Sequence, residues 1–515
     1  MGILDEILGG IHQAPLLGDA ISRLAINHIA ASTVPRPRAF SLWSPLPPGA
    51  GAMGPVSDYT SWPALTDRSY SGRHLPPAEQ SSVDELPPLD KVMPLFDRGA
   101  SATNDRSSVL FMFFAQWFTD SVLRVDATDR RKNTSNHDID LCQIYGLEES
   151  TTTILRSHQD GKLLCQEING ESYLPYLFDD DGAKLTVKPQ FAGLPYATPA
   201  RLAEIFPEKL TRERKSKAYA TGLERGNSTI GYVALNTLFM REHNRICVDL
   251  KEKNSDWDDE RLFQTARMIN IVLLLKLVVE DYINHISGKP IFTLETGFAE
   301  KQDWYRQNWI SIEFDLLYRW HSLVPDAIVV NGASYDSGAF LNNNPVFEQV
   351  GLAGLLTSAS SQRAGRIGLF NSPAFMQKAE LAAMTMARGF RLAPYNDYRQ
   401  RFGLGRLDSI DDLTSDAVTR SRLHQLYGNI DKVDFLVGLY AEDRSGDSLF
   451  GGLLNMMVAY DAFTQIFTNP LLSTNIYNAH TFTEYGLKLI DDTKSVQDLA
   501  ARNTKGPVRA RLGLK

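Results

Sequence analysis

A tyrosine and a histidine stand three residues apart in a mostly apolar stretch of the chain, EFDLLYRWHSLVPD at residues 313–326. In a helix, this spacing places Tyr318 and His321 on one face, one turn apart. A lone histidine in an apolar helix is more often a hydrogen-bonded core residue than a ligand. In a large helical protein without a zinc motif, an imidazole flanked by aromatic side chains can instead be an axial haem ligand. The stretch is therefore the first candidate site.

The rest of the sequence has no common catalytic or metal-binding motif. Its ten histidines form neither HExxH nor another zinc spacing. There is no GxSxG elbow and no Walker loop, and the glycines of FGLGRL (402–407) follow a polar stretch rather than a strand. The cysteines, Cys142, Cys165 and Cys247, are too few and too separated for a disulfide framework or a CxxC site. We expect each of them to be a small buried residue.

Composition limits the class of protein. The chain has 515 residues, 43% of them hydrophobic, and a net charge of −8, with Lys and Arg scattered along it. A nucleic-acid surface needs clustered cations, so we expect no nucleic-acid partner. The start MGILDEILGG lacks the basic region of a signal peptide. No run approaches the roughly 20 apolar residues that span a bilayer. We expect a soluble, cytoplasmic protein.

The chain divides into three segments by its apolar spacing. Residues 1–33 are amphipathic, residues 34–103 are rich in Pro, Gly and Ser, and residues 104–515 contain long runs with the helical period. Strand-like runs are few and short, as in KLLCQEI. The pattern predicts a mainly α-helical protein, with one large helical domain at 104–515 and an extended N-terminal arm. The basic tail RNTKGPVRARLGLK (502–515) is expected to be mobile.

The amphipathic segment at residues 1–31 has two interpretations. It is either a helix packed on the main core or an interfacial helix that makes peripheral contact with a membrane or another molecule. Its polar face is not basic, which favours packing on the core.

Long collinear segments of the chain resemble the haem peroxidase–cyclooxygenase superfamily, in particular the cyclooxygenases and haem-dependent fatty-acid dioxygenases. The resemblance covers about residues 57–500 and implies one large haem-peroxidase domain without the disulfide-rich growth-factor-like module. The segments that carry it include FFAQWFT (113–119), HDIDLCQIYG (137–146), MREHNRIC (240–247), YRQNWISIEFDLLYRWHSLVPD (305–326), FRLAPYNDYRQRFG (390–403) and SLFGGLL (448–454).

The resemblance implies roles for three residues. His321 matches the proximal ligand of the iron of haem b, and Tyr318 matches the tyrosine whose radical abstracts a substrate hydrogen. An oxidised haem can withdraw an electron from a nearby phenol, and burial shields the radical from side reactions. The alternative for Tyr318 is a packing phenol with a bonded hydroxyl. Gln116 matches the distal glutamine.

Asp120 departs from the family pattern, because a histidine that handles peroxide protons stands there in the relatives. A general acid–base contributes typically about 10²–10⁴-fold, so the exchange matters. Asp120 serves as a carboxylate acid–base if burial raises its pKa; alternatively peroxidase turnover is weak, or the chemistry is lost. We favour the first two together, since Tyr318 and His321 are retained.

Three further residues are candidates by their position in the family pattern. Arg225 stands where peroxidases carry a distal arginine, and it would polarise peroxide or O₂, or pair with Glu224 or a haem propionate. Ala462 aligns with the substrate-channel serine of cyclooxygenases. Lys289 aligns near the channel mouth, where it is either a partner for a substrate carboxylate or an ordinary loop lysine. Ser121 stands where calcium-binding members have an acid, so we expect no calcium site.

The resemblance implies a haem-dependent dioxygenase that adds O₂ to an unsaturated or long-chain fatty acid and forms a hydroperoxide. Two alternatives remain at this stage. One is a haem peroxidase or oxygenase that acts on a small non-lipid substrate, and the other is a haem-binding protein that has lost its distal chemistry. An oligomer is compatible with each of them.

Overall fold

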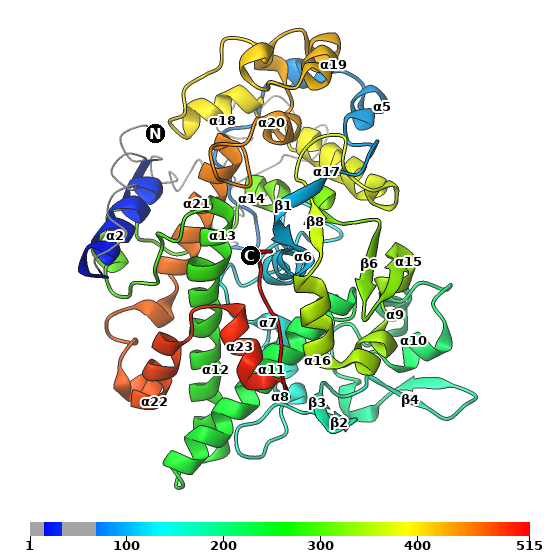
Figure 1. The fold of residues 1–515 in the computed structure, drawn as a ribbon, viewed down its shortest axis with the longest axis vertical. Coiled ribbons are helices and arrows are strands. Elements are labelled where there is room, and N and C mark those ends of the chain that lie inside the picture. Colours follow the sequence, from blue (N-terminus) through cyan, green and yellow to red (C-terminus); the bar gives the residue numbers. More distant parts are fainter. Residues whose placement is uncertain (1–14, 33–67, 515) are drawn as a thin grey trace.

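Long helices form the centre of the protein (Figure 1). The computed structural model describes residues 15–32 and 68–514. The helices of more than ten residues are α2 (Pro15–Ser32), α6 (Val109–Thr119), α11 (Ile230–Lys253), α12 (Asp259–Leu277), α16 (Asn344–Ser360), α17 (Gln377–Gly389), α19 (Ala417–Tyr427), α21 (Gly452–Phe467) and α22 (Ala479–Asp492).

Short helices and four small strand pairs complete the fold, so the prediction of a mainly α protein with few strands is confirmed. The short helices are α4 (Gln80–Asp84), α5 (Leu89–Val92), α7 (Cys142–Tyr145), α8 (Glu149–Leu155), α9 (Pro199–Ile205), α10 (Arg212–Ser216), α13 (Asn284–Ser287), α14 (Ile312–Leu317), α15 (Ser337–Phe340), α18 (Tyr395–Arg401), α20 (Phe435–Ala441) and α23 (Val496–Asn503). The antiparallel strand pairs are β1 (Thr103–Ser108) with β8 (Arg363–Gly365), β2 (Gln166–Ile168) with β3 (Glu171–Tyr173), β4 (Phe178–Asp180) with β5 (Leu185–Val187), and β6 (Ala327–Val330) with β7 (Ala333–Asp336).

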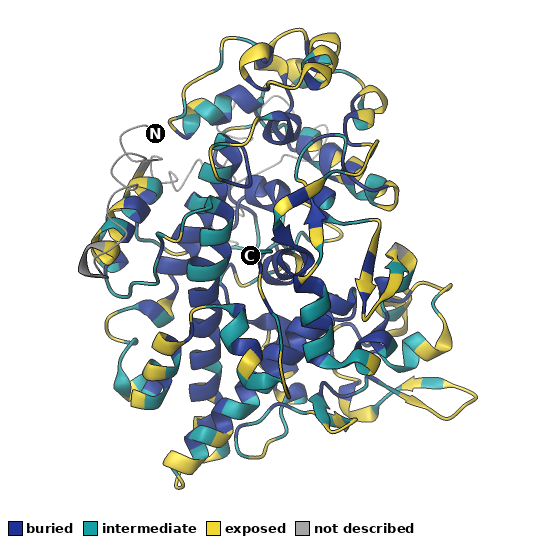
Figure 2. Ribbon diagram, viewed as in Figure 1, coloured by how far each residue is buried: buried dark blue, intermediate teal, exposed yellow. Residues whose placement is uncertain are grey.

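The core is centred on α6, α11 and α12, whose buried residues are dark blue in Figure 2. Helix α11 packs against α6, α12 and α16. The continuous helical stretch Asp259–Ser287 is long and apolar enough to cross a membrane, but 83% of its apolar window is buried inside the protein. It is therefore placed as a core helix.

Helix α6 presents one polar side chain to a cavity. Ser108 caps its start by accepting a hydrogen bond from the backbone N–H of Phe111, and such a cap is worth about 1 kcal/mol. Ten of its eleven residues are buried, while Gln116 is exposed toward the cavity described below. Apolar residues all round a helix indicate a buried core element, so α6 holds Gln116 rigidly.

The stretch around Tyr318 is not the single helix that its spacing predicts. Helix α14 begins at the Ser311 cap and ends at Leu317, and Tyr318 is its last half-helical residue. Trp320 has ψ of +52°, outside the helical range, and His321 starts a separate 3₁₀ turn, His321–Leu323. Tyr318 and His321 therefore do not share a helix face. The break turns the two side chains independently toward the cavity.

The N-terminal segments are described in part. Of the predicted amphipathic segment, residues 1–14 lie outside the described residues, whereas α2 packs on α21 through Ala25, Ile26 and Ala30. Of the predicted arm, residues 33–67 lie outside the described residues. The rest of it runs over the body, with α4 and α5 separated by irregular stretches.

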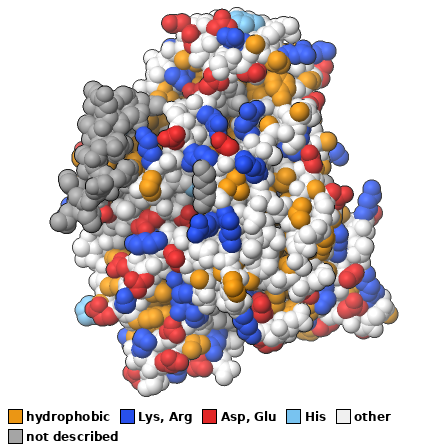
Figure 3. All heavy atoms as spheres, viewed as in Figure 1, with side chains coloured by type: hydrophobic (Ala, Val, Ile, Leu, Met, Phe, Trp, Pro, Cys, Tyr) orange, Lys and Arg blue, Asp and Glu red, His pale blue; other side chains and the backbone are white. Residues whose placement is uncertain are grey.

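The prediction of a mobile C-terminal tail is wrong. Ala510 and Leu512 are buried, and the backbone N–H of Arg511 donates to Ser360 Oγ at 3.0 Å. The tail also bridges to the first strand, because Ser108 N donates to the Leu512 carbonyl at 2.9 Å. Of its described cations, Lys505 and Arg511 are exposed, and Arg502 and Arg509 are half-buried. On the face in Figure 3, cations and acids are intermixed rather than gathered in one basic stripe.

Candidate active site

Five of the seven predicted site residues line one cavity of about 430 Å³. Gln116 and Asp120 come from α6 and its C-terminal cap, and Arg225 comes from the loop before α11. Tyr318 and His321 come from the segment after α14. This volume is within the range of small-molecule sites. Residues up to 205 positions apart in the chain are thus brought to one place.

His321 lies against a carboxylate that the sequence patterns did not indicate. Its Nδ1 is 3.1 Å from Glu380 Oε1, and Glu380, on α17, is itself buried. The contact lacks hydrogen-bond geometry, since Nδ1 has no hydrogen-bond partner. Ser372 Oγ donates to the same carboxylate oxygen at 2.5 Å and fixes it. Nε2 has no partner among the described residues, so its lone pair is left for a metal.

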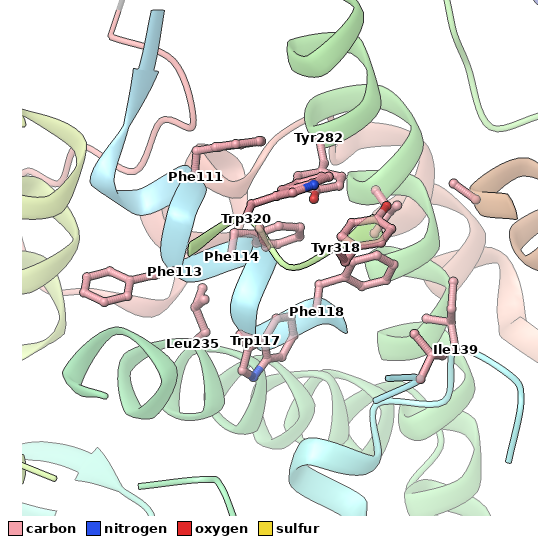
Figure 4. Close-up of a cluster of buried hydrophobic side chains, with 14 of the residues drawn as sticks. Phe111, Phe113, Phe114, Trp117, Phe118, Ile139, Leu235, Tyr282, Tyr318 and Trp320 are labelled. Carbon is pink, nitrogen blue, oxygen red and sulfur yellow. The ribbon is translucent and has the colours of Figure 1, made fainter. Parts of the chain in front are cut away.

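Tyr318 is buried in an aromatic cluster (Figure 4). Its ring stacks on Trp320, with 4.5 Å between the centroids, and meets Phe314 edge-on at 4.8 Å. Burial and, secondly, the negative charge of Asp461 raise the pKa of Tyr318, while the nearby hydroxyl of Tyr282 lowers it. The Tyr318 hydroxyl has no hydrogen-bond partner of normal geometry. It is therefore a protonated, shielded phenol.

The residues of α6 that line the cavity are held by the start of α11. Thr229 caps α11 by accepting from the N–H of Tyr232, and its hydroxyl donates to Gln116 Oε1 at 3.2 Å. The Tyr232 hydroxyl donates to Asp120 Oδ2 at 2.7 Å. Arg225 Nη1 lies 3.6 Å from Asp120 Oδ1. The cavity therefore contains a carboxylate and an amide that are held by hydrogen bonds, with a cation near the carboxylate.

Arg319, which also lines the cavity, adds a second cation near His321. Its Nε donates to the carbonyl oxygen of Asp315 at 3.0 Å. Its terminal nitrogens have no hydrogen-bond partner within the described part of the chain. Burial lowers the pKa of Arg319, and the Asp315 carboxylate raises it. Arg319 and Arg225 are thus the cavity's candidates for binding anionic groups.

The pH dependence of the free energy of unfolding should reveal the raised pKa of the buried Asp315 carboxyl group. Burial raises its pKa from 3.8 to about 7, against the opposing effects of Arg319 and Asn133. The folded protein holds this proton more tightly than the unfolded chain, so the stabilisation is complete below about pH 4 and is lost as the pH rises through 7. Relative to Asp315→Asn, the wild-type protein should lose up to roughly 1.4 kcal/mol per pH unit in this window.

Thermal unfolding of the haem-free proteins at pH 5 and pH 8 measures this difference. Asp315→Asn should gain stability relative to the wild type at pH 8. Asp303→Asn, at an exposed position, is the matched control. Equal pH dependence in Asp315→Asn and the wild type would contradict the shifted titration.

The two predicted substrate residues lie elsewhere. Ala462 is buried within α21, and Lys289 is half-buried in the loop after α13. Neither lines this cavity or the larger one beside it. The Lys289 carbonyl accepts hydrogen bonds from Ser287 Oγ at 3.0 Å and Ile291 N at 2.9 Å, which fix the loop backbone. Their predicted roles remain predictions.

The residues of the cavity fit a haem group. An apolar wall that includes Met112, Phe113 and Leu123 suits a porphyrin face. His321 presents an unpaired imidazole nitrogen, which is a common ligand of haem iron. Arg319 and Arg225 would hold the two propionates, since guanidinium groups pair well with carboxylates.

Comparison with protein-family models matches residues 101–511 to the animal haem peroxidase family. The chain belongs to this family. It is therefore a haem-dependent oxidoreductase of the peroxidase–cyclooxygenase superfamily. The predicted family is confirmed.

Two named proteins are similar to this haem peroxidase in sequence, and a third is similar in structure. It is 33% identical to prostaglandin G/H synthase 2 of Bos taurus over 465 residues, 87% of this chain and 73% of the relative. It is 32% identical to prostaglandin G/H synthase 1 of Mus musculus, over 90% of this chain and 75% of the relative. The fatty acid alpha-dioxygenase of Oryza sativa has a similar structure, with a TM-score of 0.71 at 18% identity, covering 95% of this chain and 91% of that one.

Three residues at this peroxidase site had no signal in the sequence patterns. Glu380 and Tyr232 reach it from helices far along the chain. Tyr282 lies in a π-helical segment, Val278–Ile283, between α12 and α13. Such segments are frequent at functional sites, but their hydrogen-bond pattern is not visible in the apolar spacing. Only the fold brings Tyr232 to the cavity and places Glu380 beside His321 and Tyr282 beside Tyr318.

Proposed function

We propose that this protein is a haem b-dependent dioxygenase of unsaturated or long-chain fatty acids, in which Tyr318 abstracts hydrogen from the substrate. The observation that carries the proposal is the buried, protonated Tyr318 in the wall of the cavity that His321 lines. The named relatives, prostaglandin synthases and fatty acid alpha-dioxygenases, support a lipid substrate.

The reaction uses Tyr318 as a reusable hydrogen acceptor. Haem held by His321 would supply a one-electron oxidant for Tyr318, and the proton of the phenol would pass to solvent. The tyrosyl radical takes a hydrogen atom from a substrate C–H bond and becomes a phenol again. O₂ adds to the carbon radical, and the resulting peroxyl group takes the hydrogen atom back from Tyr318. The product is a hydroperoxide, and the radical is regenerated.

The aromatic cluster around Tyr318 suits this role. Trp320 and Phe314 cover its ring, and Phe450 packs on the far side of Trp320 at 4.6 Å between centroids. Such walls exclude water from a radical and prevent side reactions. Burial also keeps the hydroxyl protonated. Among the described residues the hydroxyl has no hydrogen-bond partner of normal geometry, which leaves it available to substrate.

Oxygen uptake tests the proposal. Haem-loaded protein, primed with a trace of peroxide, should consume O₂ in the presence of linoleate, oleate or palmitate. Mass spectrometry with isotopically labelled O₂ should find both labelled atoms in one hydroperoxide product. The shorter-chain octanoate is the comparison substrate. An absence of uptake with every long-chain acid, while the haem remains bound, would overturn the proposal.

A second candidate, peroxidation of a small non-lipid substrate, is favoured by one observation. A larger cavity of about 700 Å³ adjoins the first one and shares Asp120, Leu123 and Arg225 with it. Its other walls mix charged and apolar residues, including Arg124, Glu224 and Tyr196, and this suits a small phenol or indole. Peroxide-dependent oxidation of such a compound without O₂ would distinguish this activity from the first.

A further inference from the structure

Asp120 stands where the two cavities meet. It follows the last turn of α6, its side chain is 6% exposed, and it lines both the cavity of His321 and the larger cavity beside it. A group at such a junction can exchange a proton with a molecule in the inner cavity and with solvent in the outer one. Its position therefore suits proton transfer.

Tyr232 fixes one oxygen of this carboxylate. Its hydroxyl donates to Asp120 Oδ2 at 2.7 Å, and the tyrosine is itself buried in the first turn of α11. Burial, and secondly the charge of Asp120, raise the pKa of Tyr232 far above its ordinary value. The hydroxyl therefore stays protonated and always donates. The carboxylate cannot rotate without breaking this buried hydrogen bond.

The other oxygen, Oδ1, has no hydrogen-bond donor among the described residues, and Asp120 lines both cavities. Its nearest cation is Arg225, at 3.6 Å and 61% exposed. The other titratable groups whose charge interacts with Asp120 are Arg124, after α6, and Cys142, on α7. Both groups keep their protons at neutral pH. Burial lowers the pKa of Arg124, but its acidic neighbours raise it by more. Burial raises the pKa of Cys142. Neither group is therefore suited to accept a proton from a molecule in the cavity.

We propose that Asp120 and Tyr232 form the distal proton-transfer site, in which Oδ1 of Asp120 accepts the proton of a bound peroxide and Tyr232 holds the carboxylate in place. The acid would then return the proton to the departing oxygen as the O–O bond breaks, so that this oxygen leaves as an alcohol. Haem held by His321 under the proposed function, on which this inference rests, would supply the two electrons, and the second oxygen would leave as water with two protons from solvent. Tyr232 is a positioning residue, since it acts through Asp120.

Cyanide binding tests the pair without any fatty acid. Hydrogen cyanide binds ferric haem as the anion, so its proton must pass to a distal base. The rate constant is measured from the shift of the Soret band between pH 5 and pH 9. Asp120→Asn should slow binding by about 10²-fold or more, the lower end of general-base contributions. Tyr232→Phe should slow it about 10-fold and change the pH profile.

A double variant separates positioning from mere packing. In the Asp120→Asn background, Tyr232→Phe should have no further effect, because residues that act as one unit are not additive. Tyr145→Phe is the matched control, since this buried tyrosine bonds His243 Nδ1 at 2.8 Å within the core. It should bind cyanide at the wild-type rate.

Two results would overturn the proposal. One is wild-type kinetics in Asp120→Asn, and the other is an equal slowing by Tyr232→Phe in both backgrounds. If Tyr232→Phe takes up no haem, Asp120→Glu is measured instead. Asp120→Glu should retain part of the cyanide-binding rate that Asp120→Asn loses. Equal rates in Asp120→Glu and Asp120→Asn would contradict the proposed role of Asp120 and Tyr232. Failure of fatty-acid oxidation with normal cyanide kinetics would refute only the dioxygenase proposal.

Discussion

Replacing Tyr318 with phenylalanine is expected to abolish fatty-acid-dependent O₂ uptake while the haem spectrum and cyanide binding stay unchanged. The substitution removes the hydroxyl group and changes little else. Phenylalanine keeps the stacking on Trp320 and the edge contact with Phe314. The hydroxyl that is lost has no hydrogen-bond partner of normal geometry, so its removal leaves no strong donor or acceptor unsatisfied. Loss of a group that reacts directly should lower the rate at least about 10²-fold.

Tyr282→Phe is the control for this experiment. Tyr282 is also buried, its hydroxyl also lacks a partner, and the two phenols influence each other's pKa. If Tyr318 alone abstracts hydrogen, Tyr282→Phe should retain O₂ uptake. Electron paramagnetic resonance after peroxide addition should find a tyrosyl signal that changes in Tyr318→Phe. Normal uptake by Tyr318→Phe would show that another residue carries the radical.

The sequence predicted which residues meet at the cavity better than the local structure that holds them. Gln116, Tyr318 and His321 stand in collinear segments, Asp120 and Arg225 were chosen by their position in the family pattern, and the fold brings all five to one cavity. The helix expected to carry both Tyr318 and His321 ends instead at Leu317. Apolar spacing alone does not separate a buried helix from buried irregular chain, and here tertiary packing decides the break.

The C-terminal tail, and the residues that contact Asp120 and His321, illustrate two other limits of prediction from the sequence. The net positive charge of residues 502–515 suggested mobility, but Val508, Ala510 and Leu512 alternate, and the last two are buried. This period of two is typical of a strand-like segment packed on one side. The contacts of Asp120 with Tyr232 and of His321 with Glu380 join residues 112 and 59 positions apart. No local pattern records such pairs, so only the folded chain identifies them.

Replacing His321 with alanine is expected to prevent haem binding altogether. His321 is the only imidazole that lines the described cavity, and its Nε2 is unpaired there. Without it, Arg319 and Arg225 would hold the propionates but nothing would ligate the iron. The purified variant should lack a Soret band, and added imidazole should restore one by occupying the space. His424→Ala is the control, since this exposed histidine bonds only Asp411 at the surface.

Glu380 should set how strongly His321 binds the iron. A carboxylate beside Nδ1 orients the ring and makes the opposite nitrogen a stronger ligand, and loss of such partners typically costs about 10–100-fold in affinity or activity. Glu380→Gln keeps the shape and the contact with Ser372 but removes the charge. It should bind haem more weakly and shift the ferric/ferrous potential upward, because an anionic neighbour favours the ferric state. If Glu380→Gln has the wild-type haem affinity and potential, the carboxylate does not tune His321 and is only a packing neighbour. If, in addition, His321→Ala has a normal Soret band, His321 is not the ligand of the iron.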